Sequence, residues 1–343
     1  MGGFLSSTTI FIVQGGKTMT IPESKTVTPQ TSPASQTASA ASASDPASTT
    51  PQRQLYSHAI TQSPEFLSFQ VDFAVCLKEL KEYFDMIIAG NYQTPDQLLS
   101  HVDALIRPGR TTKDSFEMLH SLRAVNDSVY AHSLNVAMIA RMIGKWLKFP
   151  AEDLKTLTLC GLLHDIGKTL IPEDLLNKRG RLTDDEYDLL CQHAQFGKDL
   201  LANLPLDTCV KTAAYMHHER CDGSGYPRHA TAEDIDDYAN IIAIADVYDA
   251  MTAARTYRAA FCPFQVIAEF EKDGLQKYKP KFILTFLEHV ASAYQNNRVL
   301  LSDSRAANIV LLNRSHLSQP LVQLDNGECI DLSRSELSIN SLL

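Results

Sequence analysis

Histidines and carboxylates of this chain gather in a few short segments, and these residue types point to metal chemistry. One segment holds two adjacent histidines, two carboxylates and a glycine-rich turn: His217-His218-Glu219-Arg220-Cys221-Asp222-Gly223-Ser224-Gly225-Tyr226-Pro227. Other candidates lie on separate segments: His132, His164, Asp165, His193 and Asp246. Imidazoles and carboxylates suit iron, manganese, nickel or zinc, and the lack of cysteine ligands speaks against a structural zinc knot. The set predicts a metal site with more than one ion. Such a site can cleave a phosphodiester, which is anionic and slow to hydrolyse.

Asp165 directly follows His164, so one short segment can supply both an imidazole and a carboxylate. A carboxylate has two oxygens and can bridge two ions about 3.5–4 Å apart. Gly167 would relieve crowding behind such a bridge, and Lys168 could point a cation at the same site. The remaining six histidines lack such neighbours and are interpreted as structural: His58, His101, His120, His229, His289 and His316.

Composition narrows the class of protein. The chain has 343 residues, of which 44% are hydrophobic, and a net charge of −9. This acidic balance argues against wrapping a nucleic-acid polymer, which needs clustered cations. The seven cysteines form no CxxC pair and predict reduced thiols in a cytoplasmic protein. We expect no membrane span, because no run approaches about 18 apolar residues, and no signal peptide.

The ends of the chain differ in character from its centre. Residues 1–62 are largely Ser, Thr, Ala, Pro and Gln and predict a disordered tail. Residues 63–111 have helical periodicity and predict a small N-terminal module for packing or dimerisation. Residues 298–343 carry two apolar runs and an Asn326-Gly327 turn, which predict a short β-hairpin appendage. We expect its strands at 309–312, 321–324 and 329–332.

Residues 112–297 predict a mainly α core domain. One helix carries His132, and another runs from Ala151 to His164. The Thr183-x-x-Glu186 pattern is a capping box that begins a helix ending near His193. Further helices are expected from Asp207 to the paired histidines, from Asn240 through Met251, and after Pro280. The candidate ligands therefore fall on or at the ends of helices.

These residues resemble the HD-GYP family, a subgroup of the HD superfamily of metal phosphohydrolases that degrades the bacterial messenger cyclic di-GMP. His164-Asp165-Ile166-Gly167-Lys168 matches the HD signature, and the segment from His217 to Pro227 matches the GYP signature. Ala245-Asp246-Val247-Tyr248-Asp249-Ala250-Met251-Thr252 is also similar to the family. The resemblance covers roughly residues 115–295 and implies an HD-type helical bundle that acts as a cyclic di-GMP phosphodiesterase.

The resemblance also implies roles for individual residues. One divalent ion, iron or manganese, would take His132, His164, Asp165 and Asp246. A second would share Asp165 and take His193, His217 and His218. A metal-activated water would attack phosphorus, with Asp165 and Lys168 as catalytic residues. Substrate phosphates would be held by Lys168, Arg255 and Arg258, with Tyr226 as a further contact to ligand or partner. For the arginines to reach the site, the preceding helix must end or bend between Thr252 and Arg255.

One position departs from part of the family. Some members have a third metal and a Glu four residues before the first histidine, where this chain has Ser128. We therefore expect two metals, with linear pGpG as the main product and GMP as the further one. Glu219 is expected to orient a histidine rather than to bind metal.

Two other hypotheses stay open at this stage. The same site could act on another cyclic dinucleotide, or on a nucleotide as in wider HD relatives. Alternatively, the chain could be a receptor that binds cyclic di-GMP, or docks a diguanylate cyclase (GGDEF) domain, without turnover. The presence of every expected ligand favours hydrolysis, since non-hydrolysing binders typically lose ligands. A homodimer is also left open.

Overall fold

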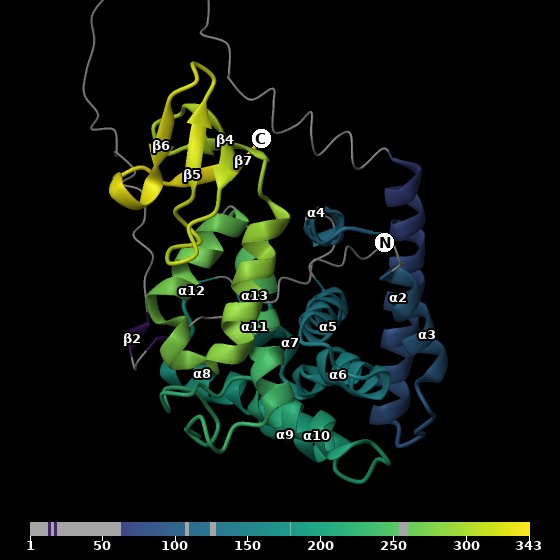
Figure 1. The fold of residues 1–343 in the computed structure, drawn as a ribbon. Helices are drawn as coiled ribbons and strands as arrows, with labels where there is room; N and C mark the ends of the chain where they lie inside the picture. The colour runs from purple at the N-terminus through teal and green to yellow at the C-terminus, as the bar shows by residue number, and fades with distance from the viewer. Residues whose placement is uncertain are drawn as a thin grey trace, which may run out of the picture.

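The chain folds as a mainly helical protein with a small C-terminal sheet, as predicted (Figure 1). The computed structural model describes residues 13–14, 17–18, 63–106, 110–123, 128–178, 180–253 and 260–343. The predicted disordered tail, residues 1–62, lies outside the described residues except for two short paired strands, β1 (Val13–Gln14) and β2 (Lys17–Thr18). The domain boundaries given above stay predictions.

Two N-terminal helices lie along one side of the molecule, at the right of Figure 1. Helix α2 (Pro64–Ile88) begins at Ser63, whose side chain accepts from the Phe66 amide, and α3 (Asp96–Leu105) packs beside it. Every third or fourth residue of α2 is buried, including Phe69, Phe73 and Leu80, so an apolar stripe faces the protein. The N-terminal helices therefore share one hydrophobic core with the rest of the chain.

The centre of the bundle is built from a group of helices, most of which carry a candidate ligand or end beside one. These are α4 (Thr112–Arg123), α5 (Val129–Trp146), α6 (Ala151–Leu163), α10 (Thr208–Met216) and α11 (Asp237–Thr252). Helices α5 and α11 are buried along most of their length. The α5–α6 contact is especially close, because a Cβ added to Gly161 would lie 2.4 Å from the Cα of Ala137.

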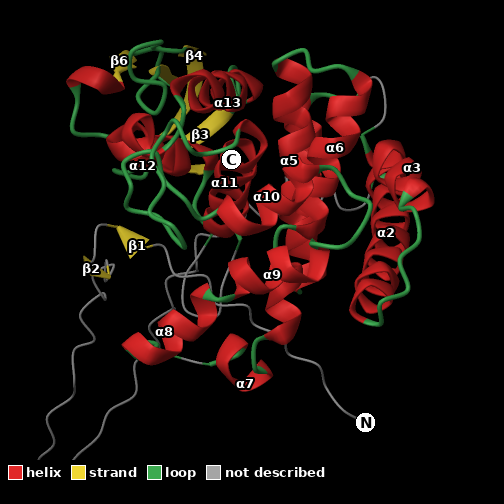
Figure 2. Cartoon of the chain, turned by 90° about the horizontal axis from the view of Figure 1, so that it is seen from below, coloured by secondary structure: helices red, strands yellow, loops and turns green. Residues whose placement is uncertain are grey.

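Four short helices follow α6 or lie near it in the sequence: η1 (Ile166–Leu170), α7 (Glu173–Leu176), α8 (Asp184–Cys191) and α9 (His193–Leu201). Helices α7 and α8 form the lower edge in Figure 2. The predicted capping box is confirmed, since Thr183 and Glu186 exchange side-chain and backbone hydrogen bonds at the start of α8. A small apolar cluster of Ile171, Leu175, Leu182 and Leu190 supports this edge.

Helices α12 (Pro263–Lys277) and α13 (Pro280–Ala293) lead into the C-terminal sheet. This sheet has five antiparallel strands in the order β6-β5-β4-β3-β7, where the sequence predicted three. The strands are β3 (Arg298–Leu301), β4 (Ala306–Leu311), β5 (Leu321–Leu324), β6 (Cys329–Asp331) and β7 (Ile339–Leu342). The expected turn joins β5 to β6, with Gly327 at a φ of 89°. The prediction missed β3 and β7 because β7 pairs with β3 across most of the segment.

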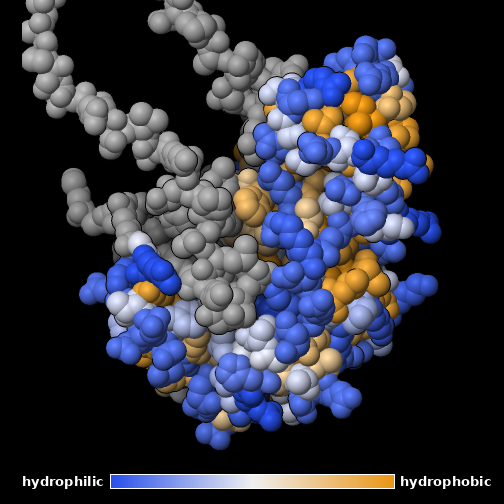
Figure 3. Space-filling view, turned by 90° about the vertical axis from the view of Figure 1, so that its left-hand side faces the viewer, coloured by the Kyte–Doolittle hydropathy of each residue, from blue (hydrophilic) through white to orange (hydrophobic). Residues whose placement is uncertain are grey.

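The surface in Figure 3 is mainly hydrophilic, with small separate apolar patches. Such scattered apolar side chains are ordinary on protein surfaces. No helix in the described ranges is both long and apolar enough to cross a bilayer. All seven cysteines belong to the described part, and each is a free thiol.

Gly161→Ala should destabilise the protein by about 1–3 kcal/mol, because the added methyl overpacks the α5–α6 contact. The matched control is Gly274→Ala in α12, where an added Cβ meets its nearest neighbours at 3.5 Å. That change should be neutral or stabilise by up to about 1 kcal/mol. Urea unfolding followed by circular dichroism measures both. Equal effects of the two substitutions would contradict the close contact.

Candidate metal centre

The structure brings all seven predicted ligands together, although they come from five segments of the chain. Most lie at helix ends: His164 caps the end of α6, His193 begins α9 and His217 caps the end of α10. His132 lies one turn into α5, and Asp246 lies within α11. Helix ends are suited to this purpose because the chain changes direction there and adjacent side chains, such as His164 and Asp165, can face one point.

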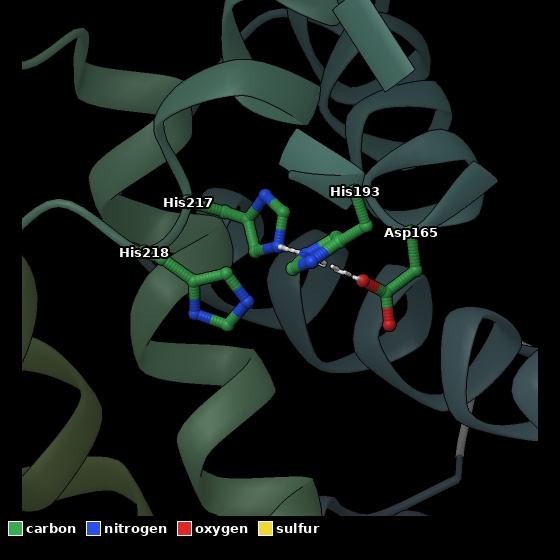
Figure 4. A group of neighbouring side chains, drawn as sticks. All are labelled: Asp165, His193, His217 and His218. Carbon is green, nitrogen blue, oxygen red and sulfur yellow. Dashed lines mark hydrogen bonds and ion pairs between the residues drawn. The ribbon is translucent and has the colours of Figure 1, made fainter. Parts of the chain in front are cut away.

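Asp165 lies at the centre of the group, with a histidine pair facing each of its oxygens. Its Oδ1 is 3.4 Å from His193 Nε2 and 3.6 Å from His217 Nε2. Figure 4 shows His193 between Asp165 and His217, with His218 beside them. The other oxygen of Asp165, Oδ2, is 3.4 Å from His164 Nε2 and 3.6 Å from His132 Nε2. A carboxylate in this position could contribute an oxygen to a cation on either side of it.

Asp246 lies next to His132. Its Oδ1 is 3.0 Å from His132 Nε2, and its Oδ2 is 4.0 Å from His218 Nδ1. The described residues contain two sets of donor atoms that are close enough to share an ion. One set is Asp165 with His193, His217 and His218, and the other is Asp165 with His132 and His164. The two sets have only Asp165 in common.

Backbone carbonyls fix three of the imidazole rings. The Nδ1 atoms of His164, His193 and His217 donate to the carbonyls of Gly161, Leu190 and Ala213, at 2.8, 2.7 and 3.1 Å. Because a carbonyl only accepts, the proton of each neutral ring is on Nδ1, and Nε2 keeps its lone pair. All three Nε2 atoms then face Asp165, in the state that a metal ion requires.

Burial controls the charge of the centre. It lowers the pKa of His193 to about 3 and also lowers those of His217 and His218, which keeps these rings neutral. Burial alone would raise the pKa of Asp165, but Lys168 and His164 hold it well below its ordinary value. Burial would likewise lower the pKa of His132, yet the Asp246 and Asp249 carboxylates raise it. The centre therefore offers neutral imidazoles at His193, His217 and His218 and an ionised carboxylate at Asp165.

Several buried nitrogen and oxygen atoms that could bind a metal ion have no hydrogen-bond partner. These atoms are His132 Nε2, His164 Nε2, Asp165 Oδ1 and Asp246 Oδ1. Leaving such atoms unpaired costs free energy, and buried polar groups are normally satisfied. Divalent cations between them would satisfy all four, so the residues present fit a metal centre.

The predicted substrate residues fall in different places. Lys168 is buried and its ammonium pairs with Asp165 Oδ2. The ring of Tyr226 stacks on the ring of His218, with 4.6 Å between the ring centroids and an interplanar angle of 24°. Arg255 and Arg258 lie outside the described residues. Helix α11 ends at Thr252, and Ala253 is extended, so the helix stops where the prediction required.

The prediction for Glu219 is wrong. Its two carboxylate oxygens accept from the backbone amides of Arg228 and Ala230, at 2.6 and 2.9 Å. Glu219 therefore anchors the glycine-rich loop instead of orienting a histidine. Asp222 shapes the same loop by accepting from both the amide and the hydroxyl of Ser224.

Two positions near the centre are explained by backbone contacts or caps. An added Cβ on Gly167 would lie 2.0 Å from the His193 carbonyl oxygen, so only glycine lets η1 approach α9 this closely. Ser128 is the N-cap of α5 and accepts from the Ala131 amide at 3.2 Å. Its hydroxyl thus has a structural role as a helix cap.

Sequence reasoning missed Asp249 and Asn135. Asp249 Oδ2 accepts from His132 Nδ1 at 2.7 Å, and Asp249 Oδ1 accepts from Asn135 Nδ2 at 2.9 Å. The available signal was spacing, because Asp249 follows Asp246 by three residues and Asn135 follows His132 by three. Residues three apart share a helix face.

Comparisons with known proteins identify the family of this chain. A family model described as an HD domain matches residues 98–282. A cyclic di-GMP phosphodiesterase of Pseudomonas aeruginosa is 31% identical over 210 residues, covering 59% of this chain and 49% of the relative. A 3'3'-cGAMP-specific phosphodiesterase of Vibrio cholerae is 40% identical over 143 residues, covering 42% and 33%. A cyclic di-GMP phosphodiesterase response regulator of Xanthomonas campestris is 36% identical over 160 residues, covering 46% and 42%. The chain spans about half or less of the length of these curated relatives.

The metal-free protein should lose stability as pH falls from about 6.5 toward 3. Because the pKa of His193 is about 3 in the folded state, the unfolded chain binds more protons throughout this window. His193→Gln should therefore reduce the loss between pH 7 and 4.5 by roughly 2 kcal/mol. Urea unfolding at the two pH values measures it. The exposed His316→Gln is the control, and an equal effect of both substitutions would contradict the prediction.

Proposed function

The chain belongs to the HD domain family, and on this premise we propose that it hydrolyses cyclic di-GMP to linear pGpG, with GMP as a further product. The observation that supports this proposal most directly is the buried Asp165, with a histidine pair facing each oxygen. Two adjacent cation positions suit a phosphodiester, whose attacking and leaving oxygens both need stabilisation.

The proposed cofactors are two divalent ions, iron or manganese. His132, His164 and Asp246 would hold one, His193, His217 and His218 the other, with Asp165 shared. Bound ions would supply Lewis acidity and lower the pKa of a coordinated water. Imidazole and carboxylate donors suit these metals, and no cysteine takes part in either set of donor atoms within the described residues.

The residues of the chain itself have distinct proposed roles. The carbonyl contacts of His164, His193 and His217 fix the rings before any ligand binds, so little reorganisation is needed. Lys168 supplies a buried cation beside Asp165 and would hold a phosphate oxygen as negative charge increases there.

Tyr226, stacked on His218, is placed to contact a bound base or partner at the edge of the site. Arg255 and Arg258 are proposed as further phosphate ligands on sequence grounds alone.

A second substrate deserves a direct test. One relative with 40% identity over 143 residues is named a 3'3'-cGAMP-specific phosphodiesterase. The two cyclic dinucleotides share the same diester backbone and differ in one base. The metal centre acts on the backbone, so it does not distinguish them. We favour cyclic di-GMP because a relative so named matches 59% of this chain, against 42% and 55% for two relatives named 3'3'-cGAMP-specific phosphodiesterases.

The proposed setting is the cytoplasm, supported by seven free thiols, which suit a reducing compartment. A diguanylate cyclase (GGDEF) domain and a second copy of the chain are the proposed protein partners. The exposed apolar residues Leu67, Val71 and Val75 on one face of α2 support a helix-mediated contact.

Asp165→Asn should abolish hydrolysis of cyclic di-GMP, a loss of at least about 1,000-fold, because one change weakens both cation positions. The measurement is chromatographic identification of products after anaerobic incubation. Asp237→Asn, an exposed change at the start of α11, is the control and should keep the wild-type rate. Full activity of Asp165→Asn would refute the assigned site.

Chelation should remove activity, and Fe²⁺ or Mn²⁺ should restore it, since the buried donor atoms need a cation.

Parallel reactions with cyclic di-GMP and 3'3'-cGAMP rank the substrates by kcat/KM. A higher value for 3'3'-cGAMP would replace the proposed substrate. Tight cyclic di-GMP binding without turnover by the metal-loaded protein would instead establish a receptor.

A further inference from the structure

We propose that Asp249, held by Asn135, is a positioning residue that raises the metal affinity of one of the two positions. This position, the His132 side, is formed by His132, His164, Asp246 and the shared Asp165, and it would bind metal more tightly than the position formed by His193, His217 and His218 (the His193 side). This inference rests on the proposed function only in assuming that divalent ions bind at the centre. It concerns a residue outside both sets of donor atoms. Asp249 contacts no predicted metal position directly and would act through the ring of His132.

Asp249 is well placed to fix this ring. It is buried with 2% relative exposure, and its Oδ2 lies 2.7 Å from His132 Nδ1. Its second oxygen accepts from Asn135 Nδ2 at 2.9 Å, which prevents the carboxylate from rotating. His132 Nε2 then points at Asp246 and Asp165, 3.0 and 3.6 Å away.

His132 differs from the other fixed histidines in the group that holds its ring. His164, His193 and His217 donate from Nδ1 to neutral backbone carbonyls. His132 donates to a carboxylate. A carboxylate partner raises the basicity of the opposite ring nitrogen and so strengthens its bond to a metal. The ring nitrogen of His132 should therefore be the strongest imidazole donor of the four.

Charge around the two positions differs in the same direction. The His132 side has Asp246 as a ligand and Asp249 behind His132, in addition to the shared Asp165. The His193 side combines Asp165 with three imidazoles and has no second carboxylate among its donor atoms. Because these groups are buried, Coulombic attraction to a dication is only weakly screened. The His132 side should therefore fill first.

The arrangement joins two helices at two levels. His132 and Asn135 lie one turn apart on α5, and Asp246 and Asp249 lie one turn apart on α11. His132 and Asp246 face the metal position, and Asn135 and Asp249, one turn further along each helix, hold the ring of His132 in place. Substitution of Asp249 should thus alter metal affinity at one position while leaving the three carbonyl-held histidines unchanged.

The test is stepwise titration of metal-free protein with Mn²⁺, followed by electron paramagnetic resonance and metal analysis. Wild-type protein should bind two ions in two steps, with the first step tighter. Asp249→Asn should weaken the first step by roughly 10- to 100-fold, and the second step by less than about 3-fold. Asn135→Leu should weaken the first step in the same direction, by a smaller factor. Asp237→Asn on the same helix should leave both steps unchanged.

Three results would overturn the inference: an unchanged first step in Asp249→Asn, equal weakening of both steps, or two equal steps in the wild-type protein. Melting of the metal-free variants separates positioning from folding. If Asp249→Asn does not fold, Asn135→Leu decides by the same criteria. If wild-type protein hydrolyses cyclic di-GMP while these titrations fail, only the inference fails. Absence of turnover in a protein with two normal binding steps would reject the proposed function alone.

Discussion

The structure depends on one buried carboxylate that must remain ionised. Asp165 has no exposed surface, and burial by itself disfavours its charge. The Lys168 ammonium offsets this cost. Lys168 and the four surrounding imidazoles must converge on Asp165 from different parts of the chain. The bundle can be understood as the packing that brings these groups to one point and excludes water from it.

Close helix packing makes this convergence reproducible. Glycines at 161 and 167 let backbones meet where any side chain would collide, which sets the distances between α5, α6, η1 and α9. Carbonyls at the ends of preceding turns then orient the rings of His164, His193 and His217. Rigid positions of this kind suit electrostatic catalysis, because donors that are already aligned require no reorganisation during the reaction.

The glycine-rich segment has both structural and chemical duties. Glu219 and Asp222 are used to hold the loop backbone, and Tyr226 stacks on His218. The histidines at its start supply ligands. A single motif thus links the metal centre to the surface loop next to it. This explains why so many residue types with special properties occur within such a short stretch.

The amino-acid sequence by itself determined the helical periodicity, the capping box at Thr183 and the set of candidate ligands, because these depend on local spacing and residue type. It also predicted that α11 ends near Thr252. Only the tertiary structure decided that Asp249 holds His132, a residue 117 positions away, and that Glu219 binds backbone amides. It likewise decided that β3 and β7 complete the sheet. Such long-range partners depend on how each helix or strand is rotated and packed, which no local pattern specifies.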